Sequence, residues 1–466
     1  MKRRANGLAL RAAAALLLAV ALTACGGGGF DSDAPGGSGG GTIGGGGGGG
    51  PGGGQTATLV LFAEDQASGN VHSFAMTLTG ITLSSSTSDE SLLPAAVALE
   101  WTSRSLAPTV LSTTQVPAAT YTQLEVLVSS PEMVVFNPTA IPPGFETFSP
   151  TLTTSSVQIA TNLTLNAGDV VGLRLDLDLL NSVSSTTEVT PQFDLVLTSF
   201  QTGELPGDID DALGTINSVD TNSFTMTLTA TGQQLILDVD TGTIFDGVAS
   251  TLADLSLRQR VEVDARLQQS GHYRALVVEV DSLAPTDFLR GLVVAVNRDI
   301  LNNATNLTLL VLEENPDQLG IDAGDQRSFT VDANTGFRIN REDLSVLGFT
   351  FDRQELRLGQ VVVIEPDSAQ ANRAAQLVLK QGTIPGLVTS VGQVTFTFSP
   401  LASFFADSGF PSVLSVTETN TEFEDLPAGL ASLQRDQTVA VRGLFLFEFS
   451  QPRLVTKRLR LLAPPP

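Results

Sequence analysis

Few side chains in this sequence can act as nucleophiles or bind a transition metal. Among 466 residues there is one cysteine, Cys25, and there are two histidines, His72 and His272. One cysteine cannot form an intrachain disulfide, and the three residues are too few for a zinc site. A Ser-His-Asp triad needs a buried, oriented histidine, whereas the sequence favours solvated histidines near turns. We therefore expect no catalytic residue, no cofactor and no metal, and a protein that is not an enzyme.

Carboxylates are abundant, and one pair has a spacing that could serve sugar chemistry. Asp176 and Asp178 lie two residues apart in a run that alternates with leucine, so on a strand they share one face. Two carboxylates can cleave a glycosidic bond when they stand about 5–5.5 or 6.5–9.5 Å apart. We favour the alternative of a solvated sheet face with Leu175, Leu177 and Leu179 turned inward. The single Trp and two Tyr also speak against a dedicated carbohydrate enzyme.

A second acidic cluster is a weak calcium candidate. Asp208, Asp210 and Asp211 gather three carboxylates within four residues. Calcium needs six to eight oxygen ligands from a shaped loop, and this stretch does not match the EF-hand pattern. We interpret it as a solvated acidic linker.

Two long segments rich in Pro and Phe are candidates for contact with a partner. The first, Ser130 to Pro150, carries Phe136, Phe145 and Phe148, and the second, Pro400 to Pro411, carries Phe404, Phe405 and Phe410. Apolar side chains exposed on long loops often mark interaction sites. The alternative is that each loop folds down and seals one end of its own domain.

The N-terminus has the features of an export signal. Basic residues precede an uncharged apolar run from Ala12 to Leu22, which is too short to span a bilayer. The run ends in Leu22-Thr23-Ala24-Cys25, which resembles the lipobox of bacterial lipoproteins. The resemblance implies that the Cys25 thiol receives a diacylglyceryl group and that residues 1–24 are removed. Gly26 in place of Asp implies sorting to the outer membrane, so we expect a lipid-anchored protein of the cell envelope.

A tether and a strongly acidic body follow. Residues 25–54 are dominated by glycine and cannot bury a core, so we expect a flexible linker. The whole chain has 25 basic and 49 acidic residues. Removal of four basic residues with the signal changes the formal net charge from −24 to −28. This charge argues against nucleic acid and against anionic lipid headgroups as partners.

The rest of the sequence predicts β-structure throughout, with an internal repeat. Short apolar-polar alternations are broken by Gly, Asn, Asp and Pro. A Gly-x-Ile/Val-x-x-Val opening recurs at Gly214, Gly291 and Gly386, and each unit later carries a turn before Phe245, Phe337 or Phe423. We expect these phenylalanines to point into the core. Each unit has about five strands, and closure into a small barrel avoids unpaired edges.

These repeats resemble the bacterial domain of unknown function numbered fifty-six sixty-six. The shared elements are the glycine opening, an Asp-x-x-Thr-x-Phe turn and a Gly-x-x-Val-x-Val strand, of which Gly359-Gln-Val-Val-Val363 is a good match. The other two units have Arg258 and Asp436 at that glycine position. We expect barrels at 207–283, 288–381 and 385–463.

The segment 55–203 has a different pattern. Val116-Pro-Ala-Ala-Thr-Tyr121 and the later strand from Gly168 to Leu179 resemble an uncharacterised family numbered forty-three eighty-two. The resemblance implies an immunoglobulin-like or transthyretin-like β-sandwich. The fold expected for the whole body is thus all-β, a sandwich followed by three closed or partly closed barrels.

Three functions remain open at this point. The first is a lipid-anchored scaffold or binding protein with a protein or glycan partner, which we favour. The second is a carbohydrate-binding or carbohydrate-cleaving module that uses Asp176 and Asp178. The third is a calcium-stabilised adhesin that uses Asp208, Asp210 and Asp211.

Overall fold

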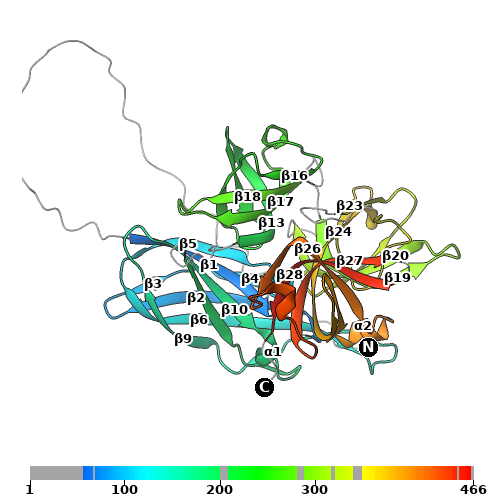
Figure 1. Cartoon of the computed structure of the whole chain (residues 1–466), viewed down its shortest axis with the longest axis horizontal. Helices are drawn as coiled ribbons and strands as arrows, with labels where there is room; N and C mark the ends of the chain where they lie inside the picture. Colours follow the sequence, from blue (N-terminus) through cyan, green and yellow to red (C-terminus); the bar gives the residue numbers. More distant parts are fainter. Residues whose placement is uncertain are drawn as a thin grey trace, which may run out of the picture. The chain divides into compact units, whose positions relative to one another are not determined.

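The computed structural model describes residues 56–66, 69–199, 208–280, 288–315, 321–339, 349–448 and 451–462. All of them belong to the second of two units, Gly54–Pro466, the first being Met1–Gly53. The signal peptide, the lipobox residues Leu22, Thr23 and Ala24, Cys25 and the tether lie outside the described residues. The body is built almost entirely from strands (Figure 1), and this confirms the all-β prediction. No helix in the described ranges is long and apolar enough to cross a membrane.

The first domain is a sandwich of two sheets that share one apolar core. In strand order, the smaller sheet consists of β12 (Phe193–Ser199), β10 (Val170–Asp178), β1 (Thr56–Gln66) and β5 (Thr109–Pro117). The larger sheet consists of β3 (Asp89–Ser91), β2 (Val71–Ser85), β6 (Thr120–Asn137) and β7 (Gly144–Phe148), with β4 (Val97–Glu100) on β2 and β9 (Ser156–Thr164) on β6. A separate pair joins β8 (Thr151–Leu152) to β11 (Glu188–Val189). Alternating residues of both sheets fill the core, together with the fully buried Trp101.

The motif around Tyr121 forms the turn between β5 and β6. The Tyr121 ring is fully buried, and its hydroxyl donates a hydrogen bond to the carbonyl oxygen of Pro117 at 2.8 Å. The turn is therefore fixed by one aromatic side chain that contributes to the core and satisfies its own polar atom.

Each of the three repeats closes a ring of five strands. Repeat 1 contains β13 (Asp208–Val219), β14 (Ser223–Leu228), β15 (Gln234–Asp238), β17 (Arg260–Leu267) and β18 (Tyr273–Val280), with β16 (Ile244–Gly247) added on β18. Repeat 2 contains β19 (Phe288–Arg298), β20 (Ala304–Asn315), β21 (Gln326–Thr330), β23 (Val361–Asp367) and β24 (Gln370–Val391), with β22 (Gly336–Ile339) on β24. Repeat 3 contains β24, β25 (Thr395–Pro400), β26 (Val413–Glu424), β27 (Thr438–Glu448) and β28 (Gln451–Leu461).

Repeats 2 and 3 share one strand. The 22 residues of β24 close repeat 2 and open repeat 3, so their strands form one continuous sheet. Residues 382–384, which we expected between two domains, lie inside this strand. The two barrels are consequently joined by backbone hydrogen bonds on both sides of the junction.

The turn that the repeats share is held by the same threonine contacts in all three. Thr243, Thr335 and Thr421 each accept a hydrogen bond from the backbone N–H three residues earlier. Each hydroxyl then donates to a carbonyl oxygen of the strand that ends the repeat, at 2.8, 2.9 and 2.7 Å. The phenylalanines two residues later, Phe245, Phe337 and Phe423, are partly buried and pack against the cores of their own repeats.

Two repeats have another residue at the position of Gly359, and the loop keeps the same backbone conformation in both. Gly359 has a φ of 84°, and the residues at the equivalent positions, Arg258 and Asp436, have φ values of 65° and 66°. A left-handed backbone costs a non-glycine residue free energy. The next residue is a glutamine in each repeat, and its side-chain oxygen accepts a backbone hydrogen bond that closes the loop at 2.9, 2.7 and 2.7 Å.

The glycine that opens each repeat is required by a close approach of two strands. A Cβ at Gly214 or Gly291 would stand less than 3.0 Å from a carbonyl oxygen of the neighbouring strand, and one at Gly386 would collide with the Phe398 ring. The opening motif therefore marks a position where strands lie too close for any side chain.

We predict that Gly291→Ala destabilises the protein by about 1–3 kcal/mol, because the added methyl group forces β20 away. Gly336→Ala is the matched control in the same repeat, since a Cβ there would stay 3.6 Å or more from its neighbours. Scanning calorimetry of both variants checks the prediction. Equal melting temperatures for the two would contradict it.

Candidate functional site

A layer of charged side chains lies buried where the domains meet. The sandwich and repeat 1 supply mostly acids, and repeats 2 and 3 supply mostly bases. None of the following is more than 6% exposed: Glu64, Asp176, Asp210, Asp211, Glu262, Asp264, Glu279, Arg290, Lys380, Arg442, Lys457, Arg458 and Arg460. Buried charges need partners, and here the partners come from different domains.

Arg460 joins the sandwich to repeat 3. Its guanidinium lies 2.6 Å from Glu64, 3.2 Å from Asp176 and 2.6 Å from Glu424. Burial, reinforced by the neighbouring Glu64 carboxylate, raises the pKa of Asp176 to about 8, although Arg460 acts in the opposite direction. One cation thus contacts three acidic side chains, and burial favours the protonated form of one of them, Asp176.

The expectation of a solvated face at Asp176 is wrong. Asp176 is 3% exposed because repeat 3 covers this side of the sheet, while Leu175, Leu177 and Leu179 point into the sandwich core as predicted. Asp178 instead accepts a hydrogen bond from the Asn181 backbone N–H at 3.0 Å and caps the short helix α1 (Leu179–Ser182). The two carboxylates therefore do not face a shared space, as sugar cleavage would require.

Two lysines join repeat 1 to the other repeats. Lys380 of repeat 2 lies 2.9 Å from Glu279 and 3.2 Å from Glu262. Lys457 of repeat 3 contacts Asp264 of repeat 1. Repeat 1 therefore presents an acidic face to two basic neighbours.

Asp208, Asp210 and Asp211 lie on β13, and Asp210 and Asp211 belong to this layer, so the interpretation as a solvated linker is wrong. Arg266 binds Asp208 with two hydrogen bonds of 2.7 and 2.6 Å. Arg458 lies 2.9 Å from Asp210, and Arg290 and Arg442 both contact Asp211. Each carboxylate thus has its own basic partner, and the described residues contain no cluster of three or more acidic, His or Cys side chains arranged for a metal ion.

The two phenylalanine-rich segments pack against each other. Phe136 and Phe145 lie 5.6 and 5.2 Å from Phe404 between ring centroids, and Phe404 and Phe405 lie on the short helix α2 (Ser403–Asp407). Phe136, Phe404 and Phe405 are buried, so of the two alternatives these side chains are folded down, although against the neighbouring domain as well as their own. Phe148 packs partly buried against the sandwich core, and Phe410 lies 5.0 Å from Phe447.

The histidines have contrasting environments. The His72 ring packs edge-on against Phe145 and Phe404, at 5.1 and 5.6 Å, and is not solvated as we expected. Burial lowers its pKa to about 4, and its Nε2 atom has no hydrogen-bond partner among the described residues. His272 lies in the β17–β18 turn with 43% of its side chain exposed, beside Asp238.

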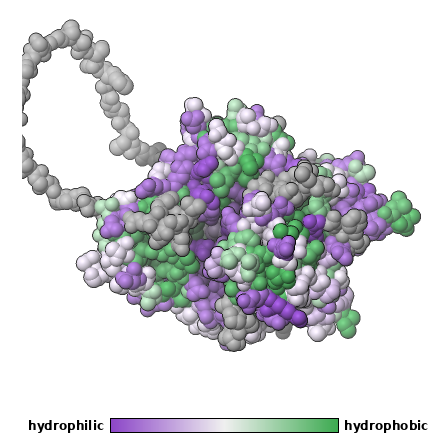
Figure 2. All heavy atoms as spheres, viewed as in Figure 1, coloured by the Kyte–Doolittle hydropathy of each residue, from purple (hydrophilic) through white to green (hydrophobic). Residues whose placement is uncertain are grey.

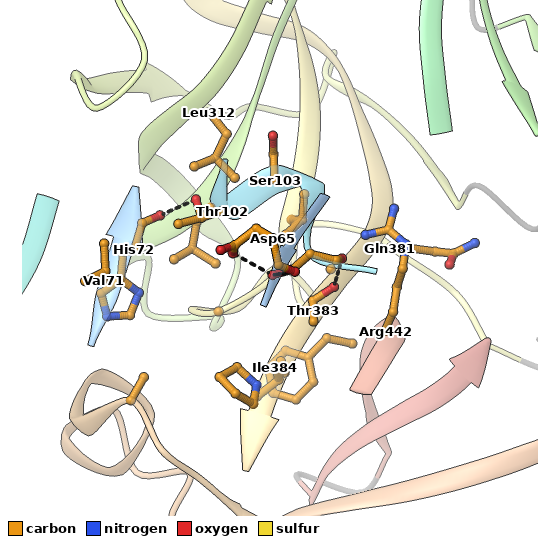
Figure 3. Close-up of a pocket in the computed structure, with 18 of the residues that line it drawn as sticks. Asp65, Val71, His72, Thr102, Ser103, Leu312, Gln381, Thr383, Ile384 and Arg442 are labelled. Carbon is orange, nitrogen blue, oxygen red and sulfur yellow. Dashed lines mark hydrogen bonds between the residues drawn. The ribbon is translucent and has the colours of Figure 1, made fainter. Parts of the chain in front are cut away.

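A cavity opens beside His72, where the sandwich meets repeats 2 and 3 (Figure 3). It encloses about 860 Å³ of space free of atoms, including its mouth. Much of its wall is apolar and includes Val71, Leu292, Leu312, Val361, Ile384 and Phe445.

Asp65 and Arg442 are charged residues of opposite sign in the lining of this cavity, and each has a buried side-chain atom without a hydrogen-bond partner among the described residues. Ser105 donates a hydrogen bond to Asp65 Oδ2 at 2.9 Å, but Asp65 Oδ1 has no partner among the described residues. Arg442 contacts Asp211 through a terminal nitrogen, while its Nε also has none. Burial raises the pKa of Asp65 well above its usual value and lowers the pKa of Arg442 to about 10.

Sequence reasoning did not find Asp65 or Arg442. Each interrupts an apolar strand, Leu59 to Ala63 before Asp65 and Val439 to Val441 before Arg442. The available signal was a single charge inside an apolar strand for Arg442, and the pair Glu64-Asp65 at the end of one for Asp65, but a solvated strand end gives the same pattern.

One of the comparisons with known proteins found a family model that matches the first repeat. Residues 214–279 match the family described as "Domain of unknown function (DUF5666)", which confirms the predicted resemblance for that repeat. No curated protein matches the chain.

Two solved structures show weak similarity. One, described as "drosophila Unr CSD456", is 9% identical, with 54% of this chain and 97% of that chain covered and a TM-score of 0.14. The other is a multidomain protein with nucleic acid binding domains from Streptococcus pneumoniae, 12% identical, with coverage of 54% and 72% and a TM-score of 0.11.

We predict that Arg460→Gln destabilises the protein by about 3–5 kcal/mol, because the buried acids Glu64 and Asp176 and the partly exposed Glu424 lose their shared cation. Arg435→Gln is the matched control in the same repeat, since the Arg435 side chain is 76% exposed. Thermal unfolding checks both variants. A melting temperature for Arg460→Gln as high as that of the control would contradict a structural role for the buried layer.

The low pKa of His72 predicts a specific pH dependence. The folded value, about 4, lies below the ordinary value of 6.5, so the unfolded chain binds a proton first as the pH falls. Wild-type protein should lose up to about 3 kcal/mol from this residue between pH 6.5 and 4, and His72→Phe should not. Denaturant unfolding of both proteins across this range measures the difference. Parallel profiles would show that His72 is readily protonated in the folded state.

Proposed function

We propose that this protein is a non-enzymatic binding protein of the bacterial cell envelope, held at a membrane through a lipid on Cys25. The binding part of the proposal is carried by one observation, the cavity between the sandwich and repeats 2 and 3, whose lining combines an apolar wall with Asp65, Arg290 and Arg442. A concave site with a mainly apolar wall and a few polar groups is the usual form of a small-molecule binding site.

The arrangement of the cavity supports binding rather than catalysis. Asp65, His72 and Ser105 all line it, which places the residue types of a hydrolytic triad together. Ser105 is hydrogen-bonded to Asp65, however, and no hydrogen bond joins the His72 imidazole to either residue in the described part of the chain. A triad needs the histidine between nucleophile and carboxylate, so we infer no catalytic role.

The membrane part of the proposal is supported by the sequence and by the surface. Leu22-Thr23-Ala24-Cys25 provides the lipidation signal, and the glycine-rich residues after it provide reach. On the face of the body seen in Figure 2, hydrophilic and hydrophobic side chains are interspersed. Such a face favours attachment through the acyl chains rather than through the body itself. We place the protein at the outer membrane, where a protein or glycan partner would also be accessible.

We predict that Cys25→Ser moves the protein from the membrane fraction to the soluble extracytoplasmic fraction without a change in melting temperature, because the thiol is the acyl acceptor and lies outside the body. Cell fractionation followed by immunoblotting measures the distribution. Ser38→Ala, within the tether, is the control and should stay with the membrane. A Cys25→Ser protein that also stayed there would refute lipid anchoring.

A further inference from the structure

We propose that the tip of the β19–β20 hairpin in repeat 2, formed by Ile300 and Leu301, inserts into the surface of a lipid bilayer with zwitterionic headgroups and forms a second membrane contact in addition to the acyl anchor. This inference goes beyond the cavity and rests on the proposed position of the protein at a membrane.

Two neighbouring apolar side chains stand in water at this tip. Ile300 is fully exposed and Leu301 is 70% exposed. Figure 1 shows the β19–β20 hairpin projecting from the body, and Figure 2, drawn from the same side, shows hydrophobic residues at the end of this projection. Apolar side chains that are exposed singly are normal on a protein surface. A pair at the end of a projection needs a reason.

The projection is an extension that the other two repeats lack. Beyond the last pair of residues that all three first hairpins share, residues 220–223 complete the turn of repeat 1 and residues 392–395 that of repeat 3, whereas repeat 2 has residues 297–306 there. Two barrels therefore close with short turns, and closure of the barrel does not require the longer hairpin. The shared pairs are Val219–Phe224, Val296–Leu307 and Val391–Phe396.

The turn at the tip satisfies polar groups of its own backbone. The Asp299 carboxylate accepts hydrogen bonds from the backbone N–H groups of Leu301 and Asn303, at 2.8 and 2.9 Å. The Asp299 carbonyl oxygen accepts one from the Asn302 N–H at 3.0 Å, and the Asn302 carbonyl oxygen accepts one from Arg298 at 2.7 Å. Polar groups without partners are costly to remove from water. The turn can approach lipid with these groups already paired.

The base of the hairpin is held by a loop of the same repeat. The Arg353 side chain donates a hydrogen bond to the Ala304 carbonyl oxygen at 3.0 Å, and Arg298 donates one to the Leu356 carbonyl oxygen. The direction of the projection is thus fixed before contact, and little conformational freedom is lost when the tip inserts.

The size of the tip favours a bilayer over a protein as its partner. A specific protein interface buries about 800 Å² on each partner, which is far more than two aliphatic side chains provide. A bilayer accepts apolar groups without a matching surface, and the flexible linker of residues 25–54, about 30 Å from end to end, would keep it within reach. A weak contact becomes effective when a tether holds both partners together.

The rest of the surface determines the kind of lipid and the extent of the contact. The formal net charge of −24, or −28 without the signal, repels anionic headgroups. Hydrophilic and hydrophobic residues are interspersed over the face seen in Figure 2, so the contact is limited to the projection. We therefore expect insertion into a bilayer of zwitterionic lipid, and only by the tip.

The test ties the protein to vesicles through Cys25, the only cysteine of the sequence. The chain from Cys25 onward, which contains the whole body Gly54–Pro466, is coupled to a maleimide lipid in phosphatidylcholine vesicles. Ile300→Trp places a fluorophore at the tip, and the native Trp101 adds a constant background because it is fully buried. Val394→Trp is the matched control, since Val394 is 62% exposed in the short turn of repeat 3.

The Ile300→Trp protein should emit at a shorter wavelength on vesicles than in solution, and it should lose intensity when the acyl chains carry bromine, which quenches on contact. The Val394→Trp protein should show neither change. Addition of Leu301→Asn to Ile300→Trp should lower the ratio of inserted to free tip by about 10-fold, because a leucine side chain is no longer buried in lipid. Equal quenching in the two proteins, or none in Ile300→Trp, would overturn the proposal.

The test also separates this inference from other partners and from the proposed anchor. A blue shift of the Ile300→Trp protein that appeared without vesicles and grew with protein concentration would identify a second copy of the chain as the partner and overturn the lipid contact. Because the maleimide lipid supplies the tether, a failure to insert leaves the fractionation result for Cys25 intact. Insertion by a protein that is not acylated in cells would support the hairpin contact and refute only the natural anchor.

Discussion

The structure depends on the neutralisation of charge between domains. An isolated ionised group buried in a protein costs several kcal/mol, and the cost is offset only when partners and hydrogen bonds are in place. Here Arg460 reaches the sandwich from the last strand of the chain, and Lys380 and Lys457 reach repeat 1 from repeats 2 and 3. The domains therefore cannot separate without exposing the layer to water or leaving charges unpaired. This constraint also determines the walls of the cavity, because Asp65 and Arg442 belong to different domains that meet there.

The residues that shape the inner faces of the barrels recur in the sequence, so this part of the fold could be recognised from it. The glycine at the start of each repeat, the threonine of the shared turn and the phenylalanine after it recur at fixed positions because each answers a local requirement. The alternation of the strands and the repeat could therefore be predicted, as could the inward orientation of Leu175 and Leu177. Even Arg258 and Asp436 keep the left-handed backbone of Gly359, so the loop geometry survives the loss of the glycine.

The site could not be predicted in the same way, because its residues depend on partners far away in sequence. Asp176 alternates with leucines as a solvated residue would, and only Arg460, 284 residues later, shows that it is buried. Phe136 and Phe404 lie in segments whose composition is typical of exposed loops, yet the two rings pack against each other. The alternation of apolar and polar residues identifies which face of a sheet points away from the core of its own domain. It cannot tell whether that face meets water or another domain.

Differences in charge between the outer faces of the repeats explain why three similar barrels have different neighbours. Strand pairing makes Glu279, Val378 and Arg460 equivalent, and likewise Asp264, Glu365 and Arg442. The inner residues at the neighbouring positions stay apolar, while these outer residues run from acidic in repeat 1 to basic in repeat 3. An acidic face cannot pack against a copy of itself without unpaired like charges, so the pattern favours contacts between unlike repeats and disfavours exchange of one repeat for another. The same divergence places Arg442 at the cavity, at a position where repeats 1 and 2 carry Asp264 and Glu365. The chemistry of the cavity is thus a consequence of the charge pattern that orders the repeats.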